Sequence, residues 1–409
     1  MDILLNVLGD KKINEKITIS GSKSESNRLL ILQKLFPEIT IENLSDSDDS
    51  VHLQHALSTK KELVDIGHAG TAMRFLTSYF AVNKGRETVL TVSERMQNRP
   101  IELLVNALKD LGAEITYQEK AGYPPIRIQG RKITKDKVQI NGNVSSQYIS
   151  SLLLIASKLE KGLEIELLGK VTSVPYINMT LSLLTQLGIE SSFEDNIIKV
   201  YPKKNIAKQT VVVESDWRSA SYFYSIVALA EIGSAIQLSA YKKESLQGDS
   251  CLAEIYQHFG VSTTFSDHFI TLKKERESNK EVLEINLKNA PDIAQTIAVT
   301  CFAEGIACNL SGLHTLKIKE TDRLVALEDE LTKLGANIAV TDESLHLKLS
   351  SAINKNIAIK TYNDHRMAMA FAPLALRVPI QINNAEVVTK SYQKFWEDMQ
   401  QIGIIINEL

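Results

Sequence analysis

The sequence predicts a two-domain α/β protein, an inside-out α/β barrel in which buried helices lie inside and sheets form the outer cover. Two repeating patterns predict this fold. A helix pattern that ends at a glycine recurs about every 70 residues, and a second series of helix patterns is apolar on nearly every face. The length of 409 residues suits two domains of about 200 residues, each able to bury its own core.

The first series consists of short segments in which an apolar helix pattern ends at a glycine and a strand pattern follows. These segments are LKDLGAEI, LTQLGIE, IYQHFGV, LTKLGANI and MQQIGIII, with the glycines Gly112, Gly188, Gly260, Gly335 and Gly403. Glycine is typical of helix C-termini because it adopts the left-handed backbone conformation with which many helices end. We therefore expect each segment to be a helix, a glycine cap and a strand.

The second series consists of segments that begin with polar residues and then become apolar all round. They are GSKSESNRLLILQKLF from Gly21, AGTAMRFLTSYFAV from Ala69, SSQYISSLLLIAS from Ser145, SDWRSASYFYSIVALA from Ser215, APDIAQTIAVTCFA from Ala290 and NDHRMAMAFAPLAL from Asn363. A helix that is hydrophobic on every face is a buried helix. We expect six repeats, each with one buried helix. The first repeat is shortened, because no glycine-ended helix and no clear strand precede its neighbour GHAGTAMR.

Six repeats suggest two domains of three repeats each. We place the boundaries near residues 20 and 215, where two of the polar helix heads begin. The N-terminal domain is then 21–215, and the C-terminal domain combines 1–20 with 216–409. Two chain crossings between the domains predict a hinge, and we expect the active site in the cleft between the domains.

Composition excludes several classes of function. The net charge of −3 gives no overall basic field for nucleic acid, and no uncharged apolar stretch is long enough to span a bilayer. The first residues, MDILLNVLGDKK, lack the pattern of a signal peptide, and the three cysteines form no CxxC motif. We expect a cytoplasmic monomer that binds neither nucleic acid nor membrane.

The polar heads of the buried helices carry the residues that point to chemistry. A helix N-terminus presents unpaired N–H groups and the positive end of the helix dipole, and it therefore binds anions. The heads also carry Lys23, Arg28, Arg74, Ser145, Ser146, Gln147, His365 and Arg366. The alternative is that these are solvated helix ends, with Asn363 and Asp364 acting only as caps.

Three further segments place charged residues in less distinctive patterns. In LKIKETDRL, Lys319 and Arg323 are four residues apart and should share a helix face, with Glu320 beside them as a proton-transfer group. This helix has an equally good alternative as a solvated amphipathic helix. In SERMQNRPI, Arg95 and Arg99 precede Pro100, which we expect at the first helical position; Lys390 lies in a polar break before another helix. Each of these three cations would by default be a surface residue.

Taken together and in this order, the motifs resemble one family. GSKSESNR, AGTAMR, ERMQNRPI, VSSQY, SVPY, APDIAQT, KIKETDRL, YNDHRMAMA and VVTKSY resemble the signature segments of the 5-enolpyruvylshikimate-3-phosphate synthase family across nearly the whole chain. The resemblance implies two domains of three βαβαββ units with the helices inside. It implies transfer of the enolpyruvyl group of phosphoenolpyruvate to the 5-hydroxyl of shikimate 3-phosphate, with release of phosphate and no metal or cofactor.

The resemblance also implies roles for individual residues. Asp292 would accept the 5-hydroxyl proton, and Glu320, assisted by Lys23 or His365, would protonate the methylene carbon. The implied ligands of phosphoenolpyruvate are Lys23, Gly70, Arg95, Gln147, Arg323, Arg366 and Lys390. The implied ligands of shikimate 3-phosphate are Lys23, Ser24, Arg28, Ser145, Ser146, Gln147, Ser173, Tyr176, Asp292, Thr315 and Lys319.

The chain departs from the family pattern at several positions. His68 stands where asparagine is usual, Phe75 where proline is found, and Thr315 where asparagine often helps to bind the 3-phosphate. Gly70 leaves space beside the phosphoenolpyruvate site, so the family's inhibitor glyphosate should compete there. His68 and Phe75 leave the strength of that inhibition open.

Two other functions are alternatives to this enzyme activity. The sister enzyme, UDP-N-acetylglucosamine enolpyruvyl transferase, shares the fold and the donor substrate, but its usual loop cysteine has no counterpart in residues 86–100. A non-catalytic anion-binding protein on the same fold is the other alternative. The combination of Asp292, Glu320 and Lys23 favours an enzyme.

Overall fold

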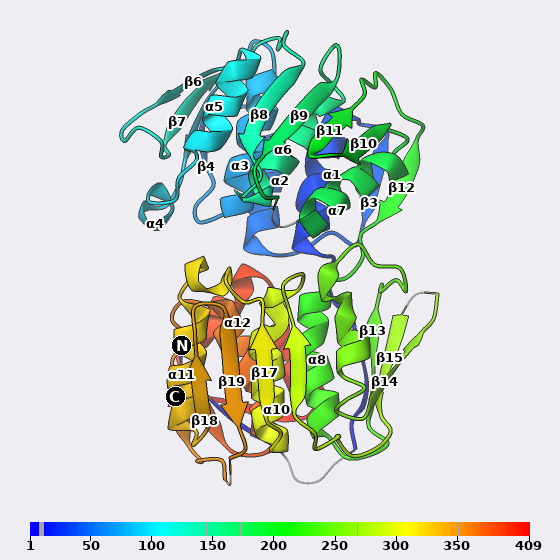
Figure 1. The fold of residues 1–409 in the computed structure, drawn as a ribbon, viewed down its shortest axis with the longest axis vertical. Helices are drawn as coiled ribbons and strands as arrows, with labels where there is room; N and C mark the ends of the chain where they lie inside the picture. The colour runs from blue at the N-terminus through cyan, green and yellow to red at the C-terminus, as the bar shows by residue number, and fades with distance from the viewer. Residues whose placement is uncertain (8–11, 144, 172–173, 268, 351) are drawn as a thin grey trace. The chain divides into compact units, whose positions relative to one another are not determined.

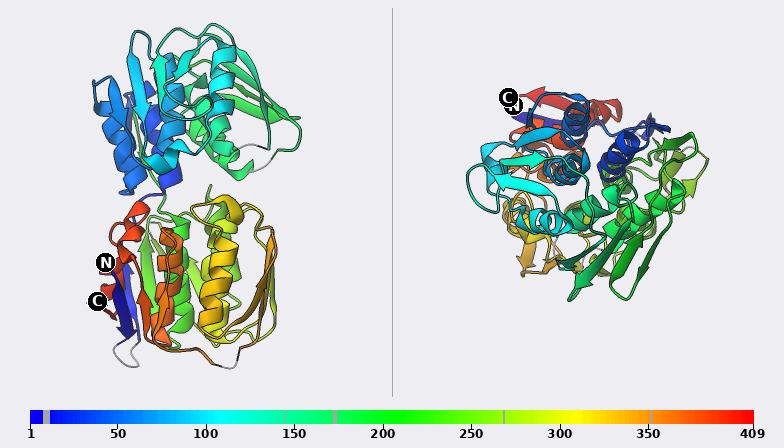
Figure 2. Two further views of the ribbon diagram at one scale, coloured as in Figure 1. Left: turned by 90° about the vertical axis from the view of Figure 1, so that its left-hand side faces the viewer. Right: turned by 90° about the horizontal axis from the view of Figure 1, so that it is seen from above.

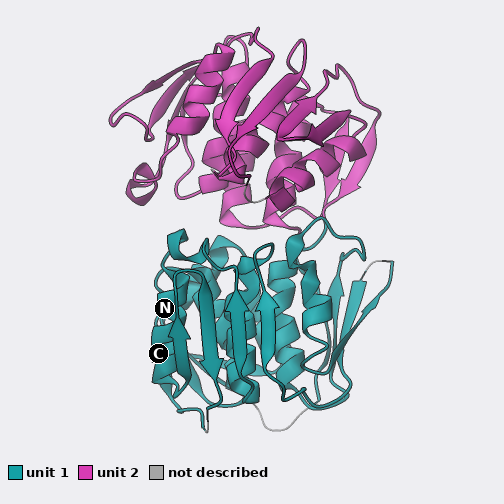
Figure 3. Cartoon of the chain, viewed as in Figure 1, with its two compact units in different colours: residues 1–20, 214–409 teal, residues 21–213 magenta. Residues whose placement is uncertain are grey.

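The protein is a mixed α/β protein, as the sequence predicts, and it divides into two compact units. The computed structural model describes the chain except for residues 8–11, 144, 172–173, 268 and 351. Unit 1 contains Met1–Ser20 and Glu214–Leu409, and unit 2 contains Gly21–Val213 (Figure 3). Each unit has its own hydrophobic core. No helix among the described residues is long and apolar enough to cross a membrane.

Unit 1 contains three four-stranded sheets. Its strands are β1 (Ile3–Val7), β2 (Asn14–Ile17), β13 (Ala235–Ser239), β14 (Val261–Phe265), β15 (Phe269–Lys274), β16 (Leu283–Asn286), β17 (Cys308–Ser311), β18 (Asn337–Val340), β19 (Ser344–Lys348), β20 (Ile357–Ile359), β21 (Ile380–Ile382) and β22 (Ile404–Glu408). The strand orders are β20-β21-β1-β22, β14-β15-β13-β2 and β16-β17-β19-β18. Since β1 and β22 pair antiparallel, with Leu5 opposite Ile406, the two ends of the chain lie side by side (Figures 1 and 2).

Unit 2 contains two four-stranded sheets and one two-stranded sheet. Its strands are β3 (Ile39–Glu42), β4 (Leu63–Asp65), β5 (Glu87–Thr91), β6 (Glu114–Tyr117), β7 (Ile126–Gln129), β8 (Lys137–Asn141), β9 (Leu163–Leu168), β10 (Ser191–Glu194), β11 (Ile197–Val200) and β12 (Gln209–Val212). The orders are β4-β5-β7-β6, β10-β11-β9-β8 and β12-β3. In the two-stranded sheet, β3, which follows the first buried helix segment, pairs in parallel with β12, the last strand of the unit.

The six segments predicted as buried helices are helices, and most of their residues are buried. They are α1 (Lys23–Leu35), α3 (Gly70–Val82) and α6 (Ser146–Ala156) in unit 2, and α8 (Trp217–Leu229), α10 (Ala294–Glu304) and α12 (His365–Phe371) in unit 1. In unit 2, α1, α3 and α6 contact one another; in unit 1, α10 contacts both α8 and α12. The sheet that contains β17 and β19 lies in front of α10 in Figure 1. The prediction of six apolar helices with polar heads is confirmed.

Four of the five glycine-ended segments are confirmed as a helix, a glycine and a strand; in IYQHFGV the helix ends at Ile255, and turns separate it from Gly260. The helices are α5 (Glu102–Leu111), α7 (Val174–Gln186), α9 (Leu252–Ile255), α11 (Arg323–Lys333) and α13 (Phe395–Gln401). All five glycines have positive φ, from 73° to 105°, and the strands β6, β10, β14, β18 and β22 follow them. The other short elements are α2 (Asp48–Ser58), α4 (Glu94–Gln97), η1 (Gly248–Cys251), η2 (Pro291–Ile293), η3 (Leu316–Ile318), η4 (Ala372–Leu376) and η5 (Ala385–Lys390).

Two local predictions are wrong. Lys319 and Arg323 do not share a helix face, because Asp322 caps a helix that begins only at Arg323 and Lys319 lies in the preceding turn. Pro100 is not the first helical residue of α5, whose N-cap is Ile101. In both cases the helix starts one turn or less after the predicted place; at α11 the side chain of Asp322 caps the helix and decides the boundary, whereas α5 has no side-chain cap.

Candidate active site

The carboxylate of Asp292, in η2 just before α10, lies at the centre of a charged cluster in unit 1. Its Oδ1 lies 3.0 Å from Nη1 of Arg323 and 3.5 Å from Nζ of Lys319. Its Oδ2 lies 3.3 Å from Nη2 of Arg366 and 3.6 Å from Nη1 of Arg218. Three of these cations stand in the first turns of α8, α11 and α12, so several helix N-termini of unit 1 converge on one carboxylate.

These cations keep Asp292 ionised. Burial alone would raise the pKa of Asp292, but the charges of Arg366, Lys319, Arg323 and Arg218 outweigh it and hold the pKa well below its usual range. A carboxylate held by so many cations is a weak base. It becomes a stronger one only when some of the surrounding positive charge is neutralised.

Arg323 links three carboxylates, and its residue surface is only 1% exposed. Its Nε donates to Oδ2 of Asp364 at 2.6 Å, and its Nη2 donates to Oε2 of Glu320 at 2.7 Å and to Oδ1 of Asp364 at 3.3 Å. The third partner is Asp292. Burial would lower the pKa of Arg323, but Asp364, Glu320 and Asp292 together raise it above its usual value.

Asp364 is both a cap and an ion-pair partner. Its Oδ1 accepts a hydrogen bond from the backbone N–H of Arg366 at 2.9 Å, which caps α12 as the sequence analysis considered. It also binds Arg323, so its carboxylate fixes the start of α12 against the start of α11. Burial would raise the pKa of Asp364, but Arg323 and His365 outweigh it and lower the pKa.

Two residues in the turn before α12 have a positive φ, a backbone conformation that residues other than glycine rarely adopt. Tyr362 and Asn363 have φ of 54° and 58°. The hydroxyl of Tyr362 donates to Oε1 of the buried Glu330 at 2.7 Å, and Nζ of Lys390 donates to the carbonyl oxygen of Asn363 at 2.7 Å. These bonds fix the chain that presents Arg366.

Glu320 lies at the edge of this cluster. Burial alone would raise the pKa of Glu320, but Arg323, His365 and Arg366 outweigh it and lower the pKa. Glu320 is therefore a carboxylate in this structure, and it would have to take up a proton before it could act as an acid. His365 is buried, with its Nδ1 3.9 Å from Oδ1 of Asp364.

In unit 2, a buried arginine joins the heads of α1, α6 and α7. Nε of Arg28 donates to Oγ1 of Thr180 at 2.7 Å, and its Nη2 donates to Oγ of Ser150 at 2.9 Å and to the carbonyl oxygen of Tyr176 at 3.3 Å. Its Nη1 donates to the carbonyl oxygen of Ser24 at 2.7 Å. The structure therefore brings together Ser24, Arg28 and Tyr176, which the sequence analysis assigned to one substrate.

A second cationic group of unit 2 surrounds the backbone of Gly70. Nη1 of Arg74 donates to the carbonyl oxygen of Gly70 at 2.7 Å, and a Cβ built on Gly70 would lie 2.9 Å from Nη1 of Arg99 and 3.1 Å from Nη1 of Arg74. Burial and the charge of Arg99 lower the pKa of Arg74, although the ring of Tyr148 offsets part of this effect. Within the described part of the chain, the buried Nε of Arg74 has no hydrogen-bond partner. Two neighbouring arginines and the N-terminus of α3 together favour binding of an anion beside Gly70.

The head of α6 lies beside the head of α3. Nε2 of Gln147 donates to Oγ1 of Thr71 at 3.2 Å, and Oγ of Ser145 accepts from the N–H of Gln147 at 3.4 Å. Ser145 is exposed and Ser146 is buried. Gln147 therefore approaches the α3 head, which also contains Gly70.

The remaining predicted residues take less central places. Lys23 is the first residue of α1 and is half-buried, and Arg95 is exposed in α4. Oγ1 of Thr315 is buried and has no hydrogen-bond partner among the described residues. Ser173 lies outside the described residues. Nε2 of His68, one of the departures from the family pattern, lies 3.6 Å from Oδ2 of Asp48.

Sequence reasoning missed several residues of these groups. It assigned nothing to Arg218 or Asp249. It expected Arg99 at the surface, where the structure has it, but did not connect it with Gly70, beside which its Nη1 lies. The polar head SDWRSAS did contain a signal, because Arg218 stands at the start of a segment that is apolar on nearly every face. Among the residues that the structure describes, no group of three His, Cys, Asp or Glu side chains could hold a metal ion.

Comparison with known proteins places the chain in a family. The family model for EPSP synthase (3-phosphoshikimate 1-carboxyvinyltransferase) matches residues 52–399. The chain is 44% identical to a 3-phosphoshikimate 1-carboxyvinyltransferase of Bacteroides fragilis and 35% identical to one of Pasteurella multocida, over 96% and 94% of each chain. An EPSP synthase of Acinetobacter baumannii, 21% identical, has the same fold over the whole of both chains, with a TM-score of 0.83. The chain therefore belongs to the EPSP synthase family.

Proposed function

We propose that this chain transfers the enolpyruvyl group of phosphoenolpyruvate to the 5-hydroxyl of shikimate 3-phosphate. The hydroxyl oxygen bonds to C2 of phosphoenolpyruvate, its proton goes to a base, and C3 gains a proton. The bond between C2 and the bridging oxygen then breaks, phosphate leaves with that oxygen, and C3 loses a proton. Family membership supports this reaction, as do two curated relatives named for it that match the chain over almost its whole length.

The observation that carries the proposal furthest is the cluster around Asp292. Asp292 is the proposed base for the 5-hydroxyl, and Glu320 is the proposed group for proton exchange at C3. Both carboxylates are held ionised by the neighbouring cations, which would make them poor proton acceptors. We propose that the carboxylate of phosphoenolpyruvate binds Arg323 and Arg366 and neutralises part of that charge, so that binding of the donor strengthens the base.

Both units supply binding residues in this proposal. Unit 1 contributes the cluster around Asp292, which includes Lys319, and also Thr315, His365 and Lys390. In unit 2, the proposed ligands of shikimate 3-phosphate are Lys23, Ser24, Arg28, Ser145, Ser146, Gln147, Ser173 and Tyr176. The backbone of Gly70 and the side chains of Arg95, Gln147 and Lys23 are the proposed ligands of the phosphoenolpyruvate phosphate. Arg99 joins this set, because its guanidinium lies beside Gly70; like Arg95, it is an exposed residue.

The finer fold description belongs to the same proposal. We infer that the two units are the predicted domains and that each is an inside-out barrel of three repeats, with the two-stranded sheet β12-β3 as the shortened repeat. The buried helices of each unit and the sheets that pack on them support this inference. A monomeric, cytoplasmic enzyme without nucleic-acid partners and without a metal or cofactor completes the proposal, and sedimentation of the purified protein tests its monomeric state.

Steady-state phosphate release tests the proposed function. The purified chain is mixed with phosphoenolpyruvate and either shikimate 3-phosphate or UDP-N-acetylglucosamine, with Lys273→Gln, an exposed position, as the control variant. We expect phosphate release that requires shikimate 3-phosphate and is unchanged in the control. Release with UDP-N-acetylglucosamine instead would assign the sister activity, and release with neither acceptor would favour an anion-binding protein.

A further inference from the structure

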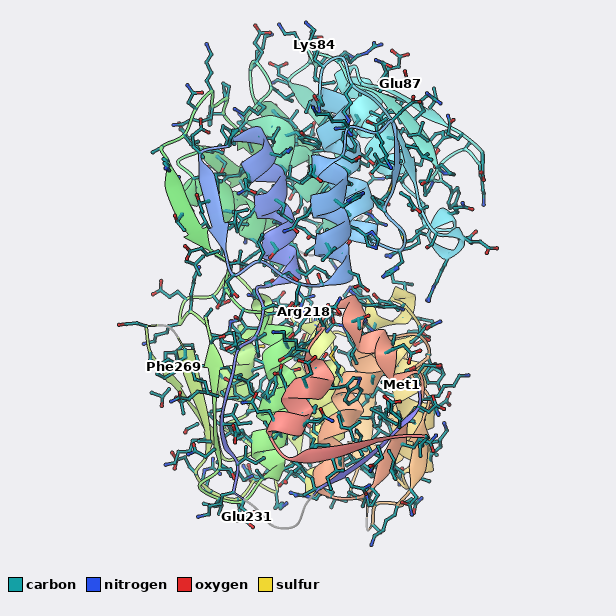
Figure 4. All side chains as sticks on the ribbon, turned by 180° about the vertical axis from the view of Figure 1, so that it is seen from behind. Met1, Lys84, Glu87, Arg218, Glu231 and Phe269 are labelled. Atoms are coloured by element: carbon teal, nitrogen blue, oxygen red, sulfur yellow. The ribbon has the colours of Figure 1, made fainter. Side chains whose placement is uncertain are left out.

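Arg218, in the first turn of α8, is an additional cation on the carboxylate of Asp292. Figure 4 labels it at the start of α8, with Glu231 beyond the other end of the same helix. Its side chain is only 12% exposed, and its Nη1 lies 3.6 Å from Oδ2 of Asp292. Arg366 approaches the same oxygen at 3.3 Å. The Oδ2 oxygen of this carboxylate is thus approached from two helix heads, those of α8 and α12.

Two further carboxylates hold Arg218 in that place. Its Nε lies 3.2 Å from Oδ2 of Asp249 in η1 and 3.4 Å from Oδ1 of Asp216, the N-cap of α8. Both acids have little exposed side-chain surface, 7% and 15%. Ion pairs shielded from water are less screened than surface pairs, so they restrict where the guanidinium can lie.

The loop that carries Asp249 is itself bonded to the start of α8. Oε1 of the buried Gln247 accepts from the N–H of Trp217 at 3.0 Å, and its Nε2 donates to the carbonyl oxygen of Ser215 at 2.9 Å. These bonds fix the distance between η1 and the helix head. Asp249 therefore reaches Arg218 from a rigid support.

We propose that Arg218, held by Asp249 and Asp216, is a positioning residue that orients the carboxylate of Asp292 for proton transfer. The inference rests on the proposed function, because it assumes that Asp292 takes the proton of the acceptor hydroxyl. Arg218 acts through Asp292 and not on the substrates. Loss of Arg218 removes a charge that weakens the base and also the support that orients it. We expect the lost orientation to dominate, so turnover should fall while the binding of both substrates stays nearly unchanged.

The protonation state of Asp249 should change how strongly Arg218 acts on Asp292. Burial raises the pKa of Asp249 to about 6, and Arg218, Asp292, Arg366 and Asp216 are the charged groups around it, with Cys251 on the adjoining turn. Above that pH, Asp249 is ionised and balances Arg218. Below it, Asp249 is neutral, the charge of Arg218 is balanced only by Asp216 and acts more strongly on Asp292, and the base is weakened. Turnover should then fall as the pH drops through about 6.

The experiment compares Arg218→Gln, Arg218→Lys and Asp249→Asn with wild type and with Arg276→Gln, an exposed arginine of the same unit. Steady-state phosphate release with phosphoenolpyruvate and shikimate 3-phosphate gives kcat and both KM values from pH 5 to 8, and urea unfolding checks that each variant is folded. We expect Arg218→Gln to lower kcat about 10- to 100-fold, with each KM within about threefold of wild type. Arg218→Lys should recover part of that loss, and Arg276→Gln should match wild type.

Asp249→Asn supplies the readout that a purely structural residue would not give. We expect a lowered kcat whose acid limb lacks the component near pH 6 that wild type has; ionisation of the substrates is common to both proteins and cancels in the comparison. An Arg218→Gln kcat within twofold of wild type would overturn the inference. So would a loss that Arg218→Lys does not relieve, or an unchanged acid limb in Asp249→Asn. Wild type that releases no phosphate would instead refute the proposed function itself.

Discussion

Replacing Arg323 with methionine should destabilise unit 1 by about 3 kcal/mol at neutral pH. Breaking a buried ion pair by removing one partner typically costs about 3–5 kcal/mol, because the other charge stays buried. Here the cost falls mainly on Asp364. Glu320 is partly exposed and can be rehydrated, and Asp292 keeps Arg366, Lys319 and Arg218 as partners. Asp364 has a fully buried side chain and loses its principal cation. We therefore expect the lower end of the range.

Tryptophan fluorescence can measure the unfolding of unit 1. The chain has two, Trp217 and Trp396, and both belong to unit 1, so their fluorescence during urea unfolding reports on that unit. For a unit of this size, a loss of 3 kcal/mol corresponds to a fall in Tm of about 6–12 °C. The matched control is Arg276→Met at an exposed position, which should change the free energy of unfolding by less than about 0.5 kcal/mol.

The pH dependence of this loss has a definite sign. In wild type the folded pKa of Asp364 is lowered, so its ion pair stabilises the protein above the ordinary carboxyl pKa and this stability is lost as the pH falls through the lower folded value. Without Arg323, Asp364 can escape its penalty by taking up a proton. The destabilisation should therefore be smaller at pH 5 than at pH 8, and adding Asp364→Asn should recover most of it. A loss below 1 kcal/mol, or one equal at both pH values, would refute this reasoning.

Four other substitutions test the assigned roles. Asp292→Asn should lower kcat by about 10²–10⁴ with both KM values nearly unchanged, and normal phosphate release would mean that another group is the base. Arg366→Ala should weaken phosphoenolpyruvate binding by about 2–5 kcal/mol, as measured by KM or calorimetry, and an unchanged affinity would exclude its contact with the donor. Arg28→Ala should weaken shikimate 3-phosphate binding while the KM of the donor stays the same; the reverse pattern would exchange the two sites. Gly70→Ala should raise the KM for phosphoenolpyruvate severalfold by displacing Arg99 and Arg74, with the fold intact, and an unaltered KM would remove this group from the donor site.

The framework of the fold could be predicted from the sequence because its signals are local. A glycine such as Gly335 terminates a helix through its own backbone conformation, and an all-apolar helix such as α8 is buried whatever packs on it. The errors arose at helix boundaries, one of which is decided by a cap. Asp322 starts α11 after Lys319, and no periodicity in KIKETDRL indicates that boundary.

The site residues were predictable in part. Lys319 and Arg323 do meet on Asp292, but through tertiary contacts and not through a shared helix face. Asp364 was considered only as a cap, because its pairing with Arg323 joins positions 41 residues apart. The support of Arg218 by Asp249 is likewise a contact between two separate elements. Such pairings depend on how helix heads converge, which hydrophobic patterns do not specify.

The fate of the bridging oxygen of phosphoenolpyruvate tests the central claim most directly. Donor labelled with ¹⁸O between C2 and phosphorus is incubated with shikimate 3-phosphate and the enzyme, and the products are analysed by mass spectrometry. Addition and elimination break the bond between carbon and oxygen, so the label should appear in the released phosphate, with one enolpyruvyl group joined to the acceptor. Label retained on the three-carbon product, as cleavage between phosphorus and oxygen would give, would contradict the account.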